Sequence, residues 1–237
     1  MAEEYDQQIP EHIRHHLCVK KTNIIINNLS QHFPCNPNQL RGLDCGCGTG
    51  WHVKRLLEHG INVTGVDISK SMLNNAIANN KAGAHFIHAP ATNLPFDTST
   101  FDFIYYINFI HHLTSEDKQN QAISEAHRLL KNHGYLYIID MNVKPILFRI
   151  YMDYIIPLTN KIDRDQNEKW LPVNYYTNLT GWKLTDVKYF TILPNIVPCL
   201  GFKTLVKIED IFEAHTRNRI GAHYCISLQK TLIEPPA

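Results

Sequence analysis

The sequence predicts an α/β protein with a doubly wound, mostly parallel sheet and helices on both faces. Three observations support this fold class. Short apolar runs alternate with amphipathic helical patterns over residues 40–142, which is typical of parallel strands joined by helices. A glycine-rich turn, Asp44 to Gly50, joins the first of these strands to the following helix. The length of 237 residues suits one domain that buries a substantial core.

The glycine-rich turn carries the strongest functional signal. Gly46, Gly48 and Gly50 stand at alternate positions, and a helical pattern begins at once with Trp51. Glycine adopts positive φ without strain and has no Cβ, so a ligand can approach the backbone closely. The N-terminus of the next helix offers unpaired N–H groups. The turn is therefore predicted to bind a nucleotide-type ligand.

Two acidic residues refine this prediction. Asp67 ends the second predicted strand, 61–67, where a carboxylate can accept hydrogen bonds from the vicinal hydroxyls of a ribose. Asp44 faces the turn, where it would repel phosphates but suits an ammonium group. A nicotinamide-dependent oxidoreductase on a Rossmann fold remains an alternative, although its G-x-G-x-x-G spacing is missing.

The rest of the chain supplies the other predicted elements. Further strands are predicted at 84–88, 101–108, 135–141, 182–192 and 222–229, and helices at 10–33, 51–59, 70–80, 116–131, 145–157 and 206–216. In the helix at 70–80, Met72, Leu73 and Ile77 are expected to face inward. In the helix at 10–33, the charged residues, Lys21 among them, are expected on a solvated face.

Several short motifs follow the glycine-rich turn in a fixed order. They are Leu94-Pro95-Phe96, Phe101-Asp102, His111-His112-Leu113 and the stretch from Glu125 to Gly134. With the turn and Asp67, this succession resembles the class I S-adenosylmethionine-dependent methyltransferases, in their ubiquinone/menaquinone-biosynthesis-like (methyltransferase type 11) branch. The resemblance is close over residues 40–142. Pro90 departs from it, because relatives carry an acidic residue there to accept from the adenine amino group.

The resemblance implies a Rossmann-like sheet of seven strands with an antiparallel last strand. It also implies the cofactor S-adenosyl-L-methionine, the product S-adenosyl-L-homocysteine, and methyl transfer to oxygen, nitrogen or carbon of a small-molecule acceptor. Residues 1–237 are expected to form one methyltransferase domain. Within it, 1–34 would be an N-terminal helical cap, 40–142 the cofactor-binding core, and 143–237 the substrate-side helices and last two strands. A catalytically silent cofactor-binding module remains a further alternative.

The resemblance also assigns candidate site residues. Those expected at the cofactor are Asp44, Gly46, Cys47, Gly48, Thr49, Gly50, Asp67, Ile68, Met72, Ala91, Thr92, Asn108 and Phe109. His111, His112 and His223 fall at the predicted ligand edge and are candidate general bases, since imidazole titrates near neutral pH. The aromatic residues Tyr151, Trp170, Tyr175 and Tyr176 are candidate substrate contacts, with packing in the core or a dimer as the alternative.

Composition argues against several other classes of function. The net charge of +1 gives no basic field for nucleic acid, and no apolar run approaches the length of a membrane span. The acidic start of the chain differs from a signal peptide, so a cytoplasmic protein is expected. The six cysteines lack zinc-site spacing and Cys45 and Cys47 are expected to be small buried side chains, so no metal site is predicted.

Overall fold

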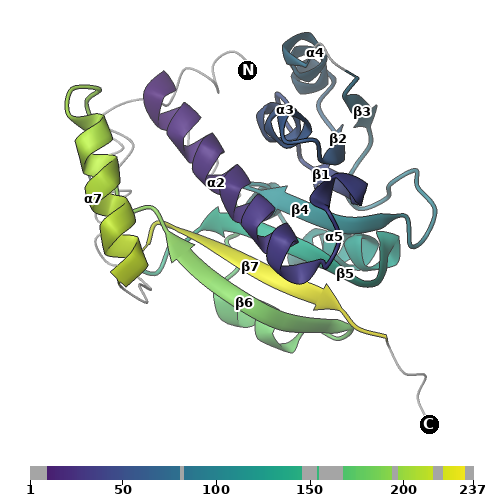
Figure 1. Ribbon diagram of the computed structural model, residues 1–237. Helices are drawn as coiled ribbons and strands as arrows, with labels where there is room; N and C mark the ends of the chain where they lie inside the picture. The colour runs from purple at the N-terminus through teal and green to yellow at the C-terminus, as the bar shows by residue number, and fades with distance from the viewer. Residues whose placement is uncertain are drawn as a thin grey trace.

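The computed structural model describes residues 10–80, 83–145, 154, 168–193, 197–215 and 221–232. Its centre is a seven-stranded sheet in the order β3-β2-β1-β4-β5-β7-β6 (Figure 1). The strands are β1 (Arg41–Cys45), β2 (Asn62–Asp67), β3 (His85–His88), β4 (Phe101–Ile107), β5 (Leu130–Met141), β6 (Trp182–Phe190) and β7 (His223–Lys230). β7 runs antiparallel to both of its neighbours, while the pairs from β3 to β5 are parallel. The predicted fold class is confirmed.

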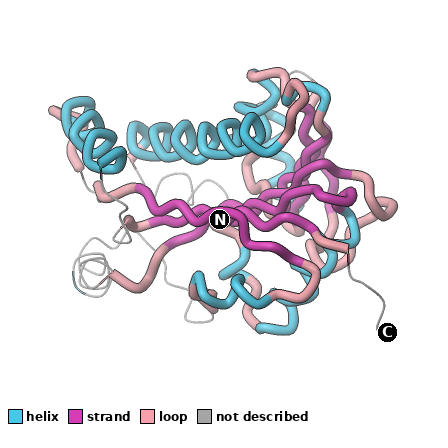
Figure 2. Tube along the Cα trace, turned by 60° about the horizontal axis from the view of Figure 1, so that its bottom comes forward, coloured by secondary structure: helices cyan, strands magenta, loops and turns pink. Residues whose placement is uncertain are grey.

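Helices cover both faces of this sheet. They are α2 (Glu11–His32), α3 (Trp51–Glu58), α4 (Lys70–Asn79), α5 (Glu116–Leu129) and α7 (Phe202–His215), with short 3-10 helices η1 (Pro37–Gln39), η2 (Ile110–His112) and η5 (Val173–Asn178). Figure 2 shows α2 and α7 on the same side of the sheet. Among the described helices, none is long and apolar enough to cross a membrane.

The central strand β4 shows why both faces are covered. Phe103 and Tyr105 pack with residues of α2, α3 and α4 in one core cluster. Ile104 and Tyr106 point the other way and pack with residues of α5 in a second cluster. Successive side chains of a strand point to opposite faces, so a strand that is apolar at every position from Phe103 to Ile107 must be buried on both sides there. The strand predicted at 101–108 is this central strand.

Most predicted element bounds agree with the structure to within a few residues, and two predictions differ from it. β5 starts five residues earlier than the predicted Tyr135, at Leu130. Ile77 of α4 was expected to face inward but is 58% exposed, and Ala76 is buried in its place. The exposure of Ile77 shows that α4 presents a narrower face to the sheet than its apolar residues suggested. The helix predicted at 145–157 lies almost entirely outside the described residues.

Two charged residues of α5, Glu125 and Arg128, hold the Leu94-Pro95-Phe96 motif in place. Glu125 Oε1 accepts from the Leu94 amide at 2.8 Å, and Arg128 donates to the carbonyls of Phe96 (2.9 Å) and Leu94 (3.2 Å). Arg128 and Glu125 also form a bidentate pair, at 2.8 Å for both contacts. These two motif residues therefore fix the loop between β3 and β4.

Replacing Arg128 with alanine should lower the free energy of unfolding by about 2–3 kcal/mol, the scale for charge-assisted hydrogen bonds whose partner stays partly buried. The hydrogen bonds from Arg128 lower the pKa of Glu125. A lowered folded-state pKa contributes stability at higher pH that is lost as pH falls through it. The difference between wild type and variant should therefore shrink in acid to the part that comes from the two carbonyl contacts. Urea unfolding at several pH values measures this. Lys118→Ala, an exposed change on the same helix, is the control, and an equal loss there would contradict the assignment.

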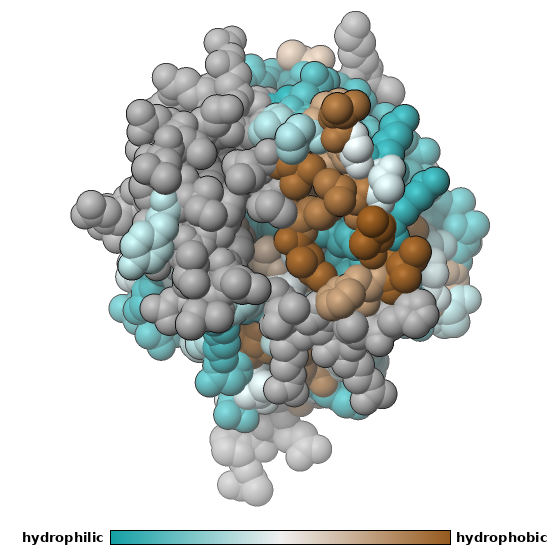
Figure 3. Space-filling model, turned by 90° about the vertical axis from the view of Figure 1, so that its left-hand side faces the viewer, coloured by the Kyte–Doolittle hydropathy of each residue, from teal (hydrophilic) through white to brown (hydrophobic). Residues whose placement is uncertain are grey.

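One face of α7 is apolar and exposed. Its residues Leu205, Ile208, Ile211 and Phe212 have exposed fractions between 38% and 62%. Figure 3, viewed from the side on which α7 lies, shows hydrophobic residues gathered on this part of the surface. The opposite side of α7 contacts α2, because Lys20 of α2 binds Glu209 and Glu213 at 2.7 and 2.8 Å. α7 is thus tied to the N-terminal helix by buried charge.

Candidate functional site

The glycine-rich turn leaves β1 and curves over the end of β2. Gly46, Gly48 and Gly50 have φ of 77°, 51° and 77°, a region that glycine adopts without strain. The Gly46 amide donates to the Val66 carbonyl at 2.8 Å, which ties the turn to β2. A Cβ on Gly46 would lie 2.1 Å from the ring of Phe109. The structure therefore brings the predicted residue Phe109 directly against the turn.

Asp67 links this turn to the helix that follows β2. Its Oδ2 accepts from the Gly48 amide at 2.9 Å, and its Oδ1 accepts from the Ser69 amide at 2.8 Å. Each oxygen of an ionised carboxylate has two acceptor positions. Asp67 therefore keeps the capacity to accept from two further donors, as a ribose would require.

Asp44 is a buried carboxylate beneath the turn. It is 2% exposed, and its Oδ2 has no hydrogen-bond partner among the described residues. Burial raises the pKa of Asp44 well above its usual range, the Tyr105 hydroxyl acts in the opposite direction, and the charge of Asp67 raises it further. A buried acceptor without a partner is costly. This oxygen is a natural binding position for a cationic group.

A buried lysine lies at the end of β4. Lys21 of α2 is 3% exposed, and its Nζ donates to Asn108 Oδ1 at 2.9 Å. Burial lowers the pKa of Lys21 to about 8, against the opposing effect of Asp140. Asn108 has φ of 50°, a left-handed conformation that is uncommon outside glycine and gathers at functional sites. Lys21 and Asn108 thus form a second polar contact at this edge of the sheet.

The expectation that Lys21 lies on a solvated face is wrong. The helix α2 packs on the sheet and is also contacted by α7 through Lys20, so more than one side of it is buried. The sequence did contain a signal, because Lys21 follows Ile13 and Leu17 at steps of four residues. Such spacing places all three on one face of a helix.

His111 is held in the interior by a carboxylate and an indole. Its Nδ1 lies 2.7 Å from Asp140 Oδ1, and its side chain is almost fully buried. The ring of Trp170 stacks on it with centroids 3.9 Å apart and planes 19° apart. A carboxylate bound at Nδ1 fixes the tautomer and orientation of an imidazole. His111 and Trp170 were predicted from the sequence but Asp140 was not, because it lies near the end of β5, 29 residues beyond His111.

The other two candidate histidines have different surroundings. His112 is half exposed, and its Nδ1 lies 3.6 Å from Glu168 Oε1. His223 pairs in register with Met141, as expected for the start of an antiparallel last strand. It is 5% exposed, and burial and the charge of Lys21 hold its pKa well below the usual range. His223 is therefore a neutral interior group at neutral pH.

The remaining predicted residues divide into two groups. At the cofactor edge, Cys47, Thr49 and Ala91 are buried, Met72 and Thr92 are partly buried, and Ile68 is 69% exposed. Burial raises the thiol pKa of Cys45 and Cys47, in accord with their expected packing role. Among the aromatic residues, Tyr176 is buried in the core, Tyr175 donates to Asn120 of α5, and Tyr151 lies outside the described residues. Tyr176 packs inside the protein, as in the core-packing alternative that the sequence left open.

Comparison with known proteins relates this chain to methyltransferases. Residues 43–138 match the sequence profile of a family described as a methyltransferase domain. The chain is 28% identical over 205 residues to a malonyl-[acyl-carrier protein] O-methyltransferase of Buchnera aphidicola, covering 86% of this chain and 73% of the relative. It is also 28% identical over 141 residues to a demethylmenaquinone methyltransferase of Staphylococcus haemolyticus, covering 55% of this chain and 57% of that one.

Solved structures support the same fold. A S-adenosylmethionine-dependent methyltransferase of Thermotoga maritima superposes with a TM-score of 0.62 at 19% identity, covering 98% of this chain and all of that one. Residues 43–138 thus match a methyltransferase domain, and the chain shares its fold with a S-adenosylmethionine-dependent methyltransferase. The methyltransferase resemblance predicted from the motifs is confirmed.

Proposed function

We propose that this protein transfers a methyl group from S-adenosylmethionine to a small-molecule acceptor bound at the carboxyl ends of β4 and β5. The observation that carries the proposal is the buried Asp44 oxygen without a partner. A methionine-type ammonium fits it, because a cation both donates to the oxygen and compensates the buried charge. The positive-φ glycines and the spare acceptor positions of Asp67 complete the fit.

Each end of the cofactor then has a partner on this chain. Asp67 would hold the ribose hydroxyls and Asp44 the ammonium. We assign the cofactor carboxylate to Lys21, the buried lysine that reaches Asn108 at the end of β4. When bound, S-adenosylmethionine supplies an electrophilic methyl group.

The acceptor side is assigned to His111 and its neighbours. Asp140 orients the imidazole of His111, and Trp170 covers one face of it. Methyl transfer requires the nucleophile to be aligned and kept from water, and a hydroxyl nucleophile must also lose its proton. We assign the activation of the acceptor to His111, with Asp140 as its positioning residue.

Calorimetric titration with S-adenosylmethionine, S-adenosylhomocysteine and NAD tests this proposal directly. Both sulfur ligands should bind and raise Tm in proportion to occupancy, because a ligand that binds the native state stabilises it. A response to NAD alone would instead support the oxidoreductase alternative. Tight cofactor binding with no turnover on quinone, phenol, amine and acyl acceptors would favour a silent binding module.

Asp67→Ala should weaken binding of S-adenosylhomocysteine by about 1.5–3 kcal/mol, the scale for hydrogen bonds to a charged group. The variant also loses the contacts to the Gly48 and Ser69 amides, so a modest fall in Tm should accompany it. Asp117→Ala, an exposed acidic residue on α5, is the control. Unchanged affinity in the Asp67 variant would remove that residue from the site.

A further inference from the structure

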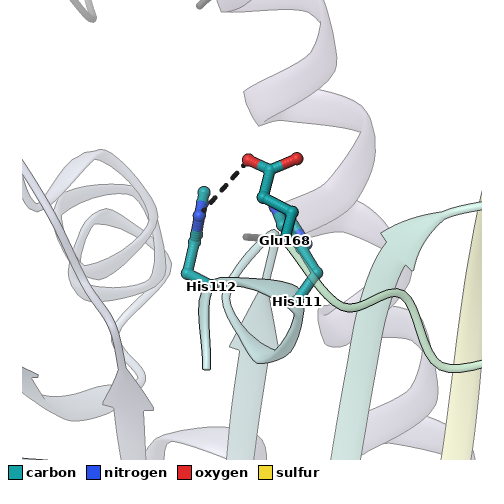
Figure 4. A group of neighbouring side chains, drawn as sticks. All are labelled: His111, His112 and Glu168. Atoms are coloured by element: carbon teal, nitrogen blue, oxygen red, sulfur yellow. Dashed lines mark ion pairs between the residues drawn. The ribbon is translucent and has the colours of Figure 1, made fainter. Parts of the chain in front are cut away.

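Three potential metal ligands meet beside the acceptor side of the site. His111, His112 and Glu168 each offer one ligand atom, and these atoms all lie within 4.8 Å of one another. Figure 4 shows His112 and Glu168 pointing toward each other above His111. No local sequence pattern predicts this group, because Glu168 lies more than fifty residues beyond the two histidines.

The protein fixes this group through its backbone. The amide of Lys169 donates to the His111 carbonyl at 3.0 Å. The buried side chain of Gln119 donates to the carbonyls of both Ile110 and Lys169, at 3.0 and 2.7 Å. The segment that carries Glu168 is therefore fastened to η2, which carries both histidines.

The chemistry of His111 also suits a metal ligand. Because its Nδ1 is engaged by Asp140 at 2.7 Å, its Nε2 is left with the lone pair. Ligating histidines characteristically bind a carboxylate through the second ring nitrogen, which sets the tautomer and raises the basicity of the ligating one. The stacked Trp170 adds an apolar wall on one side. Asp140 thus binds His111 in the way that carboxylates bind the metal-ligating histidines of known sites.

We propose that His111, His112 and Glu168 bind one divalent transition-metal ion, of which Zn²⁺ is the representative. Two imidazoles and one carboxylate form a recognised zinc ligand set, and three protein ligands leave a position open. With bonds of about 2.0–2.2 Å, the ligand atoms would approach to roughly 3.3 Å. The side chains of His112 and Glu168 are 49% and 20% exposed, so these two ligands, and not the buried His111, would make this movement.

This inference extends the proposed function, and the role of the ion rests on it. An oxygen of the acceptor would occupy the open position, where a metal ion lowers the pKa of a bound oxygen group. His111 would then act as a ligand of the ion and not as a base, and the acceptor hydroxyl would lose its proton to solvent. The substrate class assigned in this way is a small molecule that presents an ionisable hydroxyl.

Metal binding is measured on the untagged full-length chain after treatment with a chelator and its removal. ZnCl₂ is titrated by calorimetry, and Co²⁺ is added separately while its visible absorption is recorded. We expect one ion per chain, and a Co²⁺ spectrum of low coordination number. His112→Ala and Glu168→Gln should each weaken binding by at least about tenfold, and Asp140→Asn by about 10- to 100-fold through its effect on His111.

His85→Ala is the matched control, because it removes an exposed histidine on β3, away from the three ligands. The His85 variant should bind Zn²⁺ with the same affinity and stoichiometry as wild type. Absence of saturable binding, or equal affinity in all variants, would overturn the proposal and leave His112 and Glu168 as an ion pair. Titration with S-adenosylhomocysteine in the metal-free protein tests the proposed function separately, so the two failures are distinguishable.

Discussion

Replacing Asp44 with asparagine should weaken binding of S-adenosylhomocysteine by at least about 100-fold, and it should stabilise the free protein. The binding loss follows because a buried ammonium would face a neutral amide, and breaking one side of a buried pair costs about 3–5 kcal/mol. The stability gain follows because Asp44 is 2% exposed and its Oδ2 lacks a partner. Removing a buried charge of this kind should raise the free energy of unfolding by about 1–2 kcal/mol.

The gain in stability should depend on pH in a defined direction. Burial raises the pKa of Asp44 in the folded protein. A pKa that is raised in the folded state contributes stability that is fully present below the pKa of the unfolded state. This stability is lost as pH rises through the pKa of the folded state. The advantage of the asparagine variant should therefore be small in acid and grow toward neutral pH. Urea unfolding across this range, with calorimetry for binding, measures both effects.

Asp102→Asn is the matched control for the Asp44 variant. The carboxylate of Asp102 accepts from the Arg41 amide at 2.9 Å and from Lys131 Nζ at 2.8 Å. Because its oxygens have partners, the same substitution there should lower stability slightly and leave ligand affinity unchanged. A stability loss at Asp44, or unchanged ligand affinity, would refute its assignment to the ammonium.

Gly46→Ala should lower the free energy of unfolding by about 2–5 kcal/mol and abolish cofactor binding at ordinary ligand concentrations. The added Cβ would lie 2.1 Å from the Phe109 ring and only 3.0 Å from its Cβ, so movement of the ring alone would not relieve the clash. Overpacking of this kind costs about 1–3 kcal/mol, and a positive φ adds about 1–2 kcal/mol. Thermal and urea unfolding measure the sum.

Gly201→Ala separates the two contributions. Gly201 has φ of 78°, against 77° for Gly46, and a Cβ there would meet nothing within 4 Å. Its substitution should therefore show the backbone strain alone, about 1–2 kcal/mol. Equal losses at the two positions would mean that Phe109 does not pack closely on the turn.

The sequence by itself determined the sheet and the glycine-rich turn. Alternating apolar runs and helical patterns located every strand that the structure describes, and the glycines at 46, 48 and 50 predicted the turn. Asp44 and Asp67 were named from their positions at the ends of two strands. These features are readable because they depend on local backbone geometry and on side-chain periodicity.

Only the tertiary structure decided how the proposed acceptor side is built. The pairing of His111 with Asp140, the approach of Glu168 to His112, and the contact of Lys21 with Asn108 all join distant segments. The burial of Tyr176 in the core belongs to the same group. A local pattern cannot specify such contacts, because they depend on how helices and loops are placed across the sheet. Periodicity gives the face of an element, whereas packing decides what that face meets.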